Sequence, residues 1–145
     1  MSDELEQIKE TKQEYDLFCK KRELSYALWS MWKYIAQDEE WFDDFIHDQR
    51  IPYSELKALQ KNDGKIRAEM ISYDHGVQLW NQRKNILKQV DLIERRLVDV
   101  MVEARDKDIR FKEISKAYGV SIAGVMHFLK RKKHKFGIER IPEWE

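Results

Sequence analysis

The stretch "ILKQVDLIERRLVDVMVEA", residues 86–104, carries the most regular apolar pattern in the chain. Its apolar residues recur at alternating spacings of four and three, which places their side chains on one face of a helix. They are Ile86, Val90, Ile93, Leu97, Val100 and Ala104. Leu79 lies one heptad earlier, so the pattern predicts a single long helix from Val77 to about Arg105.

This apolar stripe has two interpretations, and the sequence leaves both open. In the first, a coiled-coil-like contact between subunits makes the protein a homo-oligomer. The residues of that contact are Ile86, Val90, Ile93, Leu97 and Val100. In the second, the same face packs inside a bundle that the chain forms with itself.

The remaining segments also follow helical periodicity. Further helices are expected at about 3–37, 39–50, 54–59, 65–74, 109–118 and 121–133. Four residues are expected to cap helices: Asp38, Ser54, Asp108 and Ser121. Asp74-His75-Gly76 is expected to end the helix at 65–74. Because the chain has only 2 Pro and 5 Gly and no convincing strand, the predicted fold class is all-α.

Composition narrows the class of protein. The single Cys19 excludes an intramolecular disulfide and a cysteine-based zinc site, and is typical of a reducing compartment. No apolar run approaches the roughly 20 residues that span a bilayer, and residues 1–10 are too acidic for a signal peptide. We expect a soluble cytoplasmic protein that has no contact with a membrane.

The net charge of zero hides an uneven distribution. Residues 1–60 hold 8 Lys and Arg against 14 Asp and Glu, whereas residues 106–145 hold 10 against 6. A polyanion is therefore expected to bind the C-terminal end of the chain and to be repelled by the N-terminal part.

The basic end contains a patterned stretch, "FKEISKAYGVSIAGVMHFLKRKKHK", residues 111–135. Gly119 stands where one helix must stop and the chain reverse, which often requires a left-handed residue. Ser121 is a good cap for the next helix, and Ser115 is small where two helices would cross. Four apolar residues are spaced to pack the two helices together: Ile114, Val120, Val125 and Phe128.

The segment "EISKAYGVSIAGVMHFL" resembles the helix-turn-helix superfamily, in the three-helix form of homeodomain-like and resolvase-type DNA-binding domains. The resemblance covers about residues 95–135, with the end of the long helix as the first helix. It implies that 121–133 is a recognition helix in the major groove of double-stranded DNA. The expected organisation is a helical bundle at 1–105, a helix-turn-helix at 106–135 and an apolar tail at 136–145.

The expected DNA contacts lie on this unit. They are Lys112, Ser121, Ala123, His127, Lys130, Arg131, Lys132, Lys133 and Lys135. The first two turns of the recognition helix contain no Arg, Lys, Asn or Gln, which are the usual readers of bases. The cations near its C-terminal end suit phosphates, so we expect salt-dependent backbone binding and modest direct readout.

The segment at residues 38–48 is strongly acidic. Residues 38–48 hold six acids, and Glu39, Asp43 and His47 share one helical face, but no second segment offers further metal ligands. We interpret this face as solvated, or as a docking face for a basic protein partner.

The C-terminal tail is unusually apolar, since it carries Phe136, Ile138, Ile141 and Trp144. It either folds back on the helices or binds a partner.

The sequence thus predicts a non-enzymatic, oligomeric DNA-binding protein, because no catalytic set, cofactor loop or metal-ligand pattern is present. The first role expected is that of a transcriptional regulator associated with the nucleoid. A phage small terminase subunit, which marks viral DNA for packaging, is the second. A protein–protein adaptor or inhibitor that uses the acidic helical face is the alternative from another class.

Overall fold

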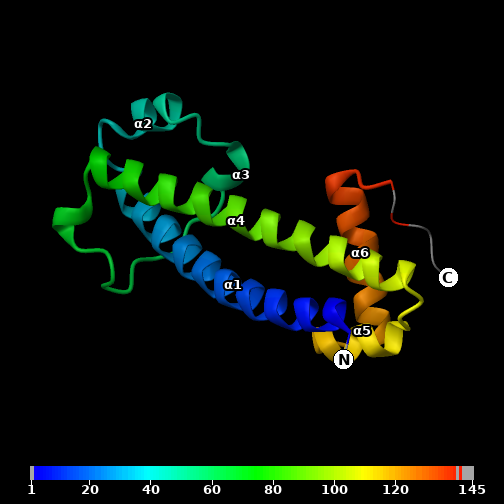
Figure 1. Ribbon diagram of the computed structural model, residues 1–145. Coiled ribbons are helices and arrows are strands. Elements are labelled where there is room, and N and C mark those ends of the chain that lie inside the picture. Colours follow the sequence, from blue (N-terminus) through cyan, green and yellow to red (C-terminus); the bar gives the residue numbers. More distant parts are fainter. Residues whose placement is uncertain (1, 140, 142–145) are drawn as a thin grey trace. The chain divides into compact units, whose positions relative to one another are not determined.

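The computed structural model describes residues 2–139 and 141, and all regular secondary structure within that part is helical (Figure 1). The predicted all-α class is confirmed. The elements are α1 (Asp3–Ala36), α2 (Phe42–Asp48), α3 (Tyr53–Leu56), a short 3-10 helix η1 (Ala68–Met70), α4 (Tyr73–Asp106), α5 (Phe111–Tyr118) and α6 (Ile122–Phe136). Among the described residues, no helix combines the length and apolar character needed to cross a membrane.

The chain divides into two compact units, and each long helix contributes one part to each unit. The first unit holds the described residues up to Phe18 and from Gln89 onward, and the second holds Cys19–Lys88. The domain boundary expected from the sequence lies near residue 105. In the structure, the segment after residue 105 instead shares a compact unit with the start of α1 and the end of α4.

The second unit is built around aromatic side chains. Trp29 stacks on Trp32 and on Trp80, with ring centroids 5.8 and 5.2 Å apart. Phe45 of α2 lies 5.0 Å from the Trp32 ring, and all three of Trp29, Trp32 and Phe45 are fully buried. Rings of this size bury a large apolar area, so they account for much of the packing in this unit.

A buried ion pair fixes the short α3 in the same unit. The Glu55 carboxylate accepts hydrogen bonds from Nε and Nη2 of Arg83, at 3.0 and 3.1 Å, and from Nε1 of Trp29 at 3.1 Å. Lys33 is fully buried beside them and donates to the Glu55 carbonyl. Burial lowers the pKa of Lys33 to about 8, since Glu55 only partly offsets the cost of the buried charge and Arg83 adds to it.

Several expectations about this unit are wrong. Asp38 and Ser54 do not cap helices, because Trp41 and Pro52 hold the N-cap positions of α2 and α3. Asp74-His75-Gly76 does not end a helix, because α4 begins at Tyr73 and continues through Gly76. The helix expected at 65–74 is reduced to η1, since the Asn62 side chain bonds both the N–H and the carbonyl of Ile66. Such local side-chain bonds compete with helix formation.

Gly76 has a packing role inside α4. A Cβ atom at this position would lie 2.3 Å from two carbons of the Trp32 ring and 2.9 Å from a carbon of Phe45. The missing side chain therefore lets the aromatic core approach the helix backbone. This explains why a residue that weakens isolated helices occurs here in the first turn of a long one.

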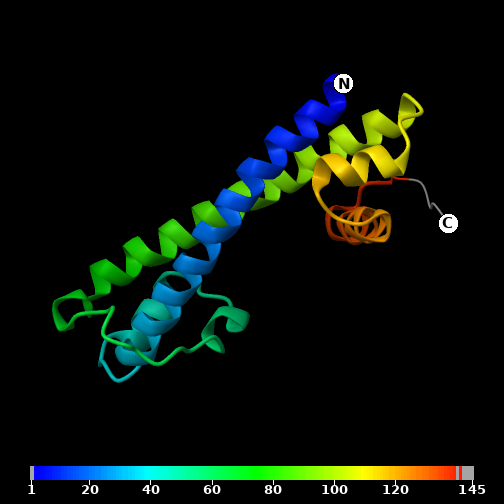
Figure 2. The ribbon, with the colours of Figure 1, turned by 90° about the horizontal axis from the view of Figure 1, so that it is seen from below.

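The first unit joins the start of α1 to the end of α4 in antiparallel directions. Glu4 pairs with Lys107. Further along, Oε1 of Glu14 lies 3.0 Å from Nη2 of Arg96. Figures 1 and 2 both show these helix ends side by side, with α5 and α6 next to them. The shared core includes Ile8, Leu97, Met101, Ile114 and Leu129, all fully buried.

The heptad residues of α4 lie in the chain's own core. Val90, Ile93 and Leu97 are buried, and Ile86 and Val100 are half-buried. This placement fits the intramolecular interpretation of the stripe. A contact between subunits through Val90, Ile93 and Leu97 would require these side chains to leave the packing that they already have.

The described part of the tail folds back on the first unit. Ile138 packs against the core, and Ile141 is buried in it. Phe136 is half-buried at the end of α6, with the guanidinium carbon of Arg95 4.6 Å from its ring centroid. Trp144, the other apolar residue of the tail, lies outside the described residues.

The close approach at Gly76 predicts the sign of one substitution. An Ala residue usually stabilises a helix relative to Gly by up to about 1 kcal/mol. Because its methyl group would overlap Trp32, Gly76→Ala should instead lower the free energy of unfolding by about 1–3 kcal/mol. Urea denaturation measures the difference, with Gln78→Ala, at an exposed position of α4, as control. A more stable Gly76→Ala variant would contradict this packing.

Candidate nucleic-acid interface

The connection between α5 and α6 is short and tightly bonded. Gly119 adopts the expected left-handed conformation, with φ of +83°, and its N–H donates to the Ser115 carbonyl at 2.8 Å. Ser121 caps α6, as predicted, because the N–H of Gly124 donates to its Oγ at 3.0 Å. These bonds satisfy backbone groups at both helix ends and set the direction in which α6 leaves the turn.

The cap expected at Asp108 is wrong. Arg110 occupies the N-cap position of α5 and makes no side-chain cap bond. Asp108 has a φ of +62°, and its N–H donates to the Arg105 carbonyl at 3.0 Å. It therefore terminates α4 instead of starting α5, since a left-handed residue of this kind usually follows the end of a helix.

The packing of α5 on α6 agrees with the sequence analysis at four positions. Ile114, Ser115, Val125 and Phe128 are buried between the helices. Val120 was expected to join them, but its side chain is 39% exposed. Its methyl group lies against Gly124, where an added Cβ would be 3.2 Å from Val120 Cγ2. Val120 thus covers the outside of the turn and not the core.

Helix α6 presents one uncovered face. Val125, Phe128, Leu129 and Lys132 are buried. The opposite residues, which we call the exposed face of α6, are Ala123, His127, Lys130, Arg131 and His134. Their spacings of four, three, one and three keep them on one side of a helix. Of the other expected DNA contacts, Lys112 and Ser121 are exposed and Lys133 is half-buried.

Two of the expected DNA contacts are held by acids. Lys132 is buried, with Nζ 2.6 Å from Oε2 of Glu94 on α4. Nζ of Lys135 lies 2.8 Å from Oδ1 of Asp91 and 3.1 Å from Oε1 of Glu94. Their charges are thus matched within the chain. Lys132 continues the buried spacing that includes Val125 and Phe128, which is a signal that the sequence contained.

Glu94 is the centre of this network, and sequence reasoning did not single it out. Its side chain is 2% exposed, and the Tyr15 hydroxyl donates to it at 2.8 Å. Burial would raise the pKa of the Glu94 carboxyl, but the hydrogen bonds from Lys132, Tyr15 and Lys135 outweigh burial and hold it below its usual value. Glu94 is thus a buried carboxylate that joins α1, α4 and α6.

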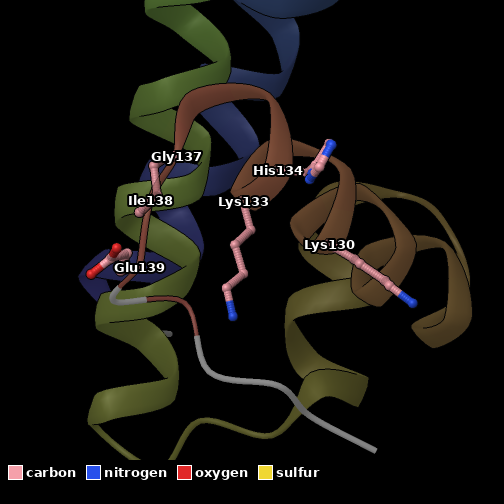
Figure 3. A pocket seen from close by; sticks show the side chains of 6 residues that line it. All are labelled: Lys130, Lys133, His134, Gly137, Ile138 and Glu139. Carbon is pink, nitrogen blue, oxygen red and sulfur yellow. The ribbon is translucent and has the colours of Figure 1, made fainter.

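The last turns of α6 border a hollow of about 350 Å³. Its lining residues are Lys130, Lys133, His134, Gly137, Ile138 and Glu139. In Figure 3 the Lys133 side chain extends towards the space between α6 and residues 137–139, whereas Lys130 extends away from it. Lys130 and Lys133 therefore point in different directions.

The charge of this region is strongly positive. Residues 109–138 contain 8 Lys and Arg, and Glu113 is the single acid. The acids that neutralise Lys132 and Lys135 come from α4. The exposed cations Lys112, Lys116, Lys130 and Arg131 lie on α5 and α6, the two helices on either side of the turn.

The acidic segment 38–48 belongs to the second unit. Asp43, Asp44 and Asp48 are exposed on α2, opposite the buried Phe45. Glu39 precedes that helix, so it does not continue the face of Asp43 and His47. Over residues 2–139 and 141, no group of three or more His, Cys, Asp or Glu side chains is placed to hold a metal ion.

Comparisons of the chain with protein-family models, with curated proteins and with solved structures gave no match.

The Glu94 network predicts a stability change and its pH dependence. Glu94→Gln leaves Lys132 buried without a carboxylate, so it should lower the free energy of unfolding at pH 7 by about 3 kcal/mol. A carboxyl whose pKa is lower in the folded state stabilises the fold above its unfolded pKa, and this contribution disappears as the pH falls through the folded pKa.

The parent should therefore lose more stability than Glu94→Gln between pH 6 and 3, and the two should converge in acid. Denaturant titrations at a series of pH values measure this. Glu103→Gln, at an exposed position of α4, is the control. Equal stability of the parent and Glu94→Gln at pH 7 would contradict the network.

Proposed function

We propose that the chain binds duplex DNA, with α5 and α6 acting as a helix-turn-helix and α6 as the recognition helix. The observation that carries this proposal is the exposed face of α6. Its residues are exposed, and it ends in cations while the opposite side is packed in the core. A single uncovered helix with basic residues has the shape and charge that a major groove accepts.

The phosphate contacts are assigned to fewer residues than the sequence analysis expected. Lys130 and Arg131 are the main candidates, because they are exposed on the same face as His127. Lys112 of α5, which is also exposed, is an additional contact. We leave Lys132 and Lys135 out, because breaking their bonds to Glu94 and Asp91 would cost more than a solvated phosphate contact returns.

In the proposed docking, the start of α6 enters the groove and its cationic end follows the backbone. Phosphate contacts release counterions, so the affinity should fall steeply with salt. The groups at the start of the helix are small or apolar, and they supply few hydrogen bonds to base edges. The backbone grip therefore provides most of the affinity, and shape or copy number adds selectivity.

Transcriptional regulation is the role that we propose first for this binding, and packaging of viral DNA is the second. Both roles use several copies of a weak binding unit. Because Val90, Ile93 and Leu97 are buried in the chain's own core, an oligomer would use a different surface.

The test compares two double variants that remove the same charge. Lys130→Ala/Arg131→Ala removes two cations of the exposed face, and Lys61→Ala/Lys88→Ala removes two exposed cations of the second unit. Fluorescence anisotropy with a labelled duplex, over a range of salt, measures both. The first variant should bind at least tenfold more weakly at low salt, with a slope of log affinity against log salt reduced by about two.

The control variant should keep the slope of the parent. Circular dichroism shows that each variant is folded, and the exposure of all four side chains makes loss of the fold unexpected. A parent protein that binds no duplex at low salt overturns the proposal. Equal weakening by the two double variants overturns the assignment to α6 and leaves only unspecific charge attraction.

A further inference from the structure

The start of α6 has unusual chemistry for a DNA-reading helix. Residues 119–126 read "GVSIAGVM" and contain no charged or amide side chain. The only polar side chain is that of Ser121, whose Oγ already accepts the N–H of Gly124 as a helix cap. The side chains of this segment therefore bring almost no hydrogen-bonding group towards a ligand.

The same segment nevertheless exposes apolar groups. Val120 is 39% exposed and Ile122 is 41% exposed. Ala123, which follows Ile122, is exposed too. Val120 lies next to Gly124, where an added Cβ would be 3.2 Å from its Cγ2. We call the three exposed aliphatic side chains at residues 120–123 the apolar tip.

We propose that the apolar tip recognises C5-methyl groups of pyrimidines in the major groove, an inference that rests on the proposed DNA binding. The edges of base pairs in that groove offer acceptors, amino donors and one apolar group, which is the methyl group of thymine. Aliphatic side chains without donors match only the last of these. 5-Methylcytosine presents the same methyl group at the same place in the groove.

Charge favours DNA over a protein partner as the occupant of the tip. The exposed cations Lys112, Lys116, Lys130 and Arg131 belong to the same two helices, and residues 109–138 contain only Glu113 as an acid. An apolar protein partner would leave these cations without matched charge. A duplex supplies phosphates for the cations and methyl groups for the tip in one ligand.

Replacing thymine by uracil isolates the methyl group. A duplex rich in A·T pairs is prepared with all thymines or with all uracils, and both forms keep the same base pairing and phosphates. The parent should bind the uracil duplex about fourfold more weakly for each methyl group that it contacts, which is the factor for burying one such carbon. A G·C duplex with 5-methylcytosine should correspondingly bind more tightly than its unmethylated form.

A variant ties the discrimination to the tip. Ile122→Ser changes one exposed side chain and leaves the Ser121 cap and the buried residues of α6 intact. It should discriminate less between thymine and uracil duplexes than the parent does, while keeping the salt slope of the parent. Leu92→Ser, at a position 47% exposed on α4, is the matched control and should still discriminate between the duplexes.

The outcomes separate this inference from the proposed function. Salt-dependent binding by the parent with equal affinity for thymine and uracil duplexes overturns the methyl readout and leaves DNA binding intact. Discrimination that is as large in Ile122→Ser as in the parent moves the readout away from the tip and overturns the assignment. Absence of binding to every duplex at low salt overturns the proposed function, and the inference with it.

Discussion

The buried carboxylate of Glu94 is the constraint on which the arrangement of the first unit depends. A carboxylate that is 2% exposed needs charged or hydrogen-bonding partners, and it takes them from Tyr15, Lys132 and Lys135. Lys132 and Lys135 lie on α6, and their bonds turn the same side of that helix inward as the burial of Val125, Phe128 and Leu129 does. The orientation of the exposed face follows from this, because it is the side opposite Lys132.

The exposed side of α6 changes in character along the helix, from apolar to cationic. Its start and the turn before it are apolar, with Val120 and Ile122 exposed beside Ser121, which caps the helix. Its far end is cationic, at Lys130 and Arg131. Apolar groups and cations recognise different parts of a duplex, namely methyl groups in the groove and phosphates on the backbone. The proposed function and the proposed methyl readout therefore use two ends of the same exposed helix.

Several features were predictable because their causes are local. Gly119 takes a left-handed conformation because a helix must end there, and Ser121 caps α6 because its oxygen is next to unbonded N–H groups. The errors have non-local causes. Gly76 was taken as a break because its effect on an isolated helix is unfavourable, but contact with Trp32, 44 residues away in sequence, makes its missing side chain useful.

By itself, the sequence determined the all-α class, the positions of both long helices, the turn before α6 and the basic character of the C-terminal end. Periodicity, capping and composition act within a few residues, so they can be read along the chain. Only the tertiary structure decided that Lys132 and Lys135 are neutralised by acids of α4, and that Val90, Ile93 and Leu97 are covered. Those outcomes depend on segments some 40 to 120 residues apart, for which a single sequence carries no pairing information.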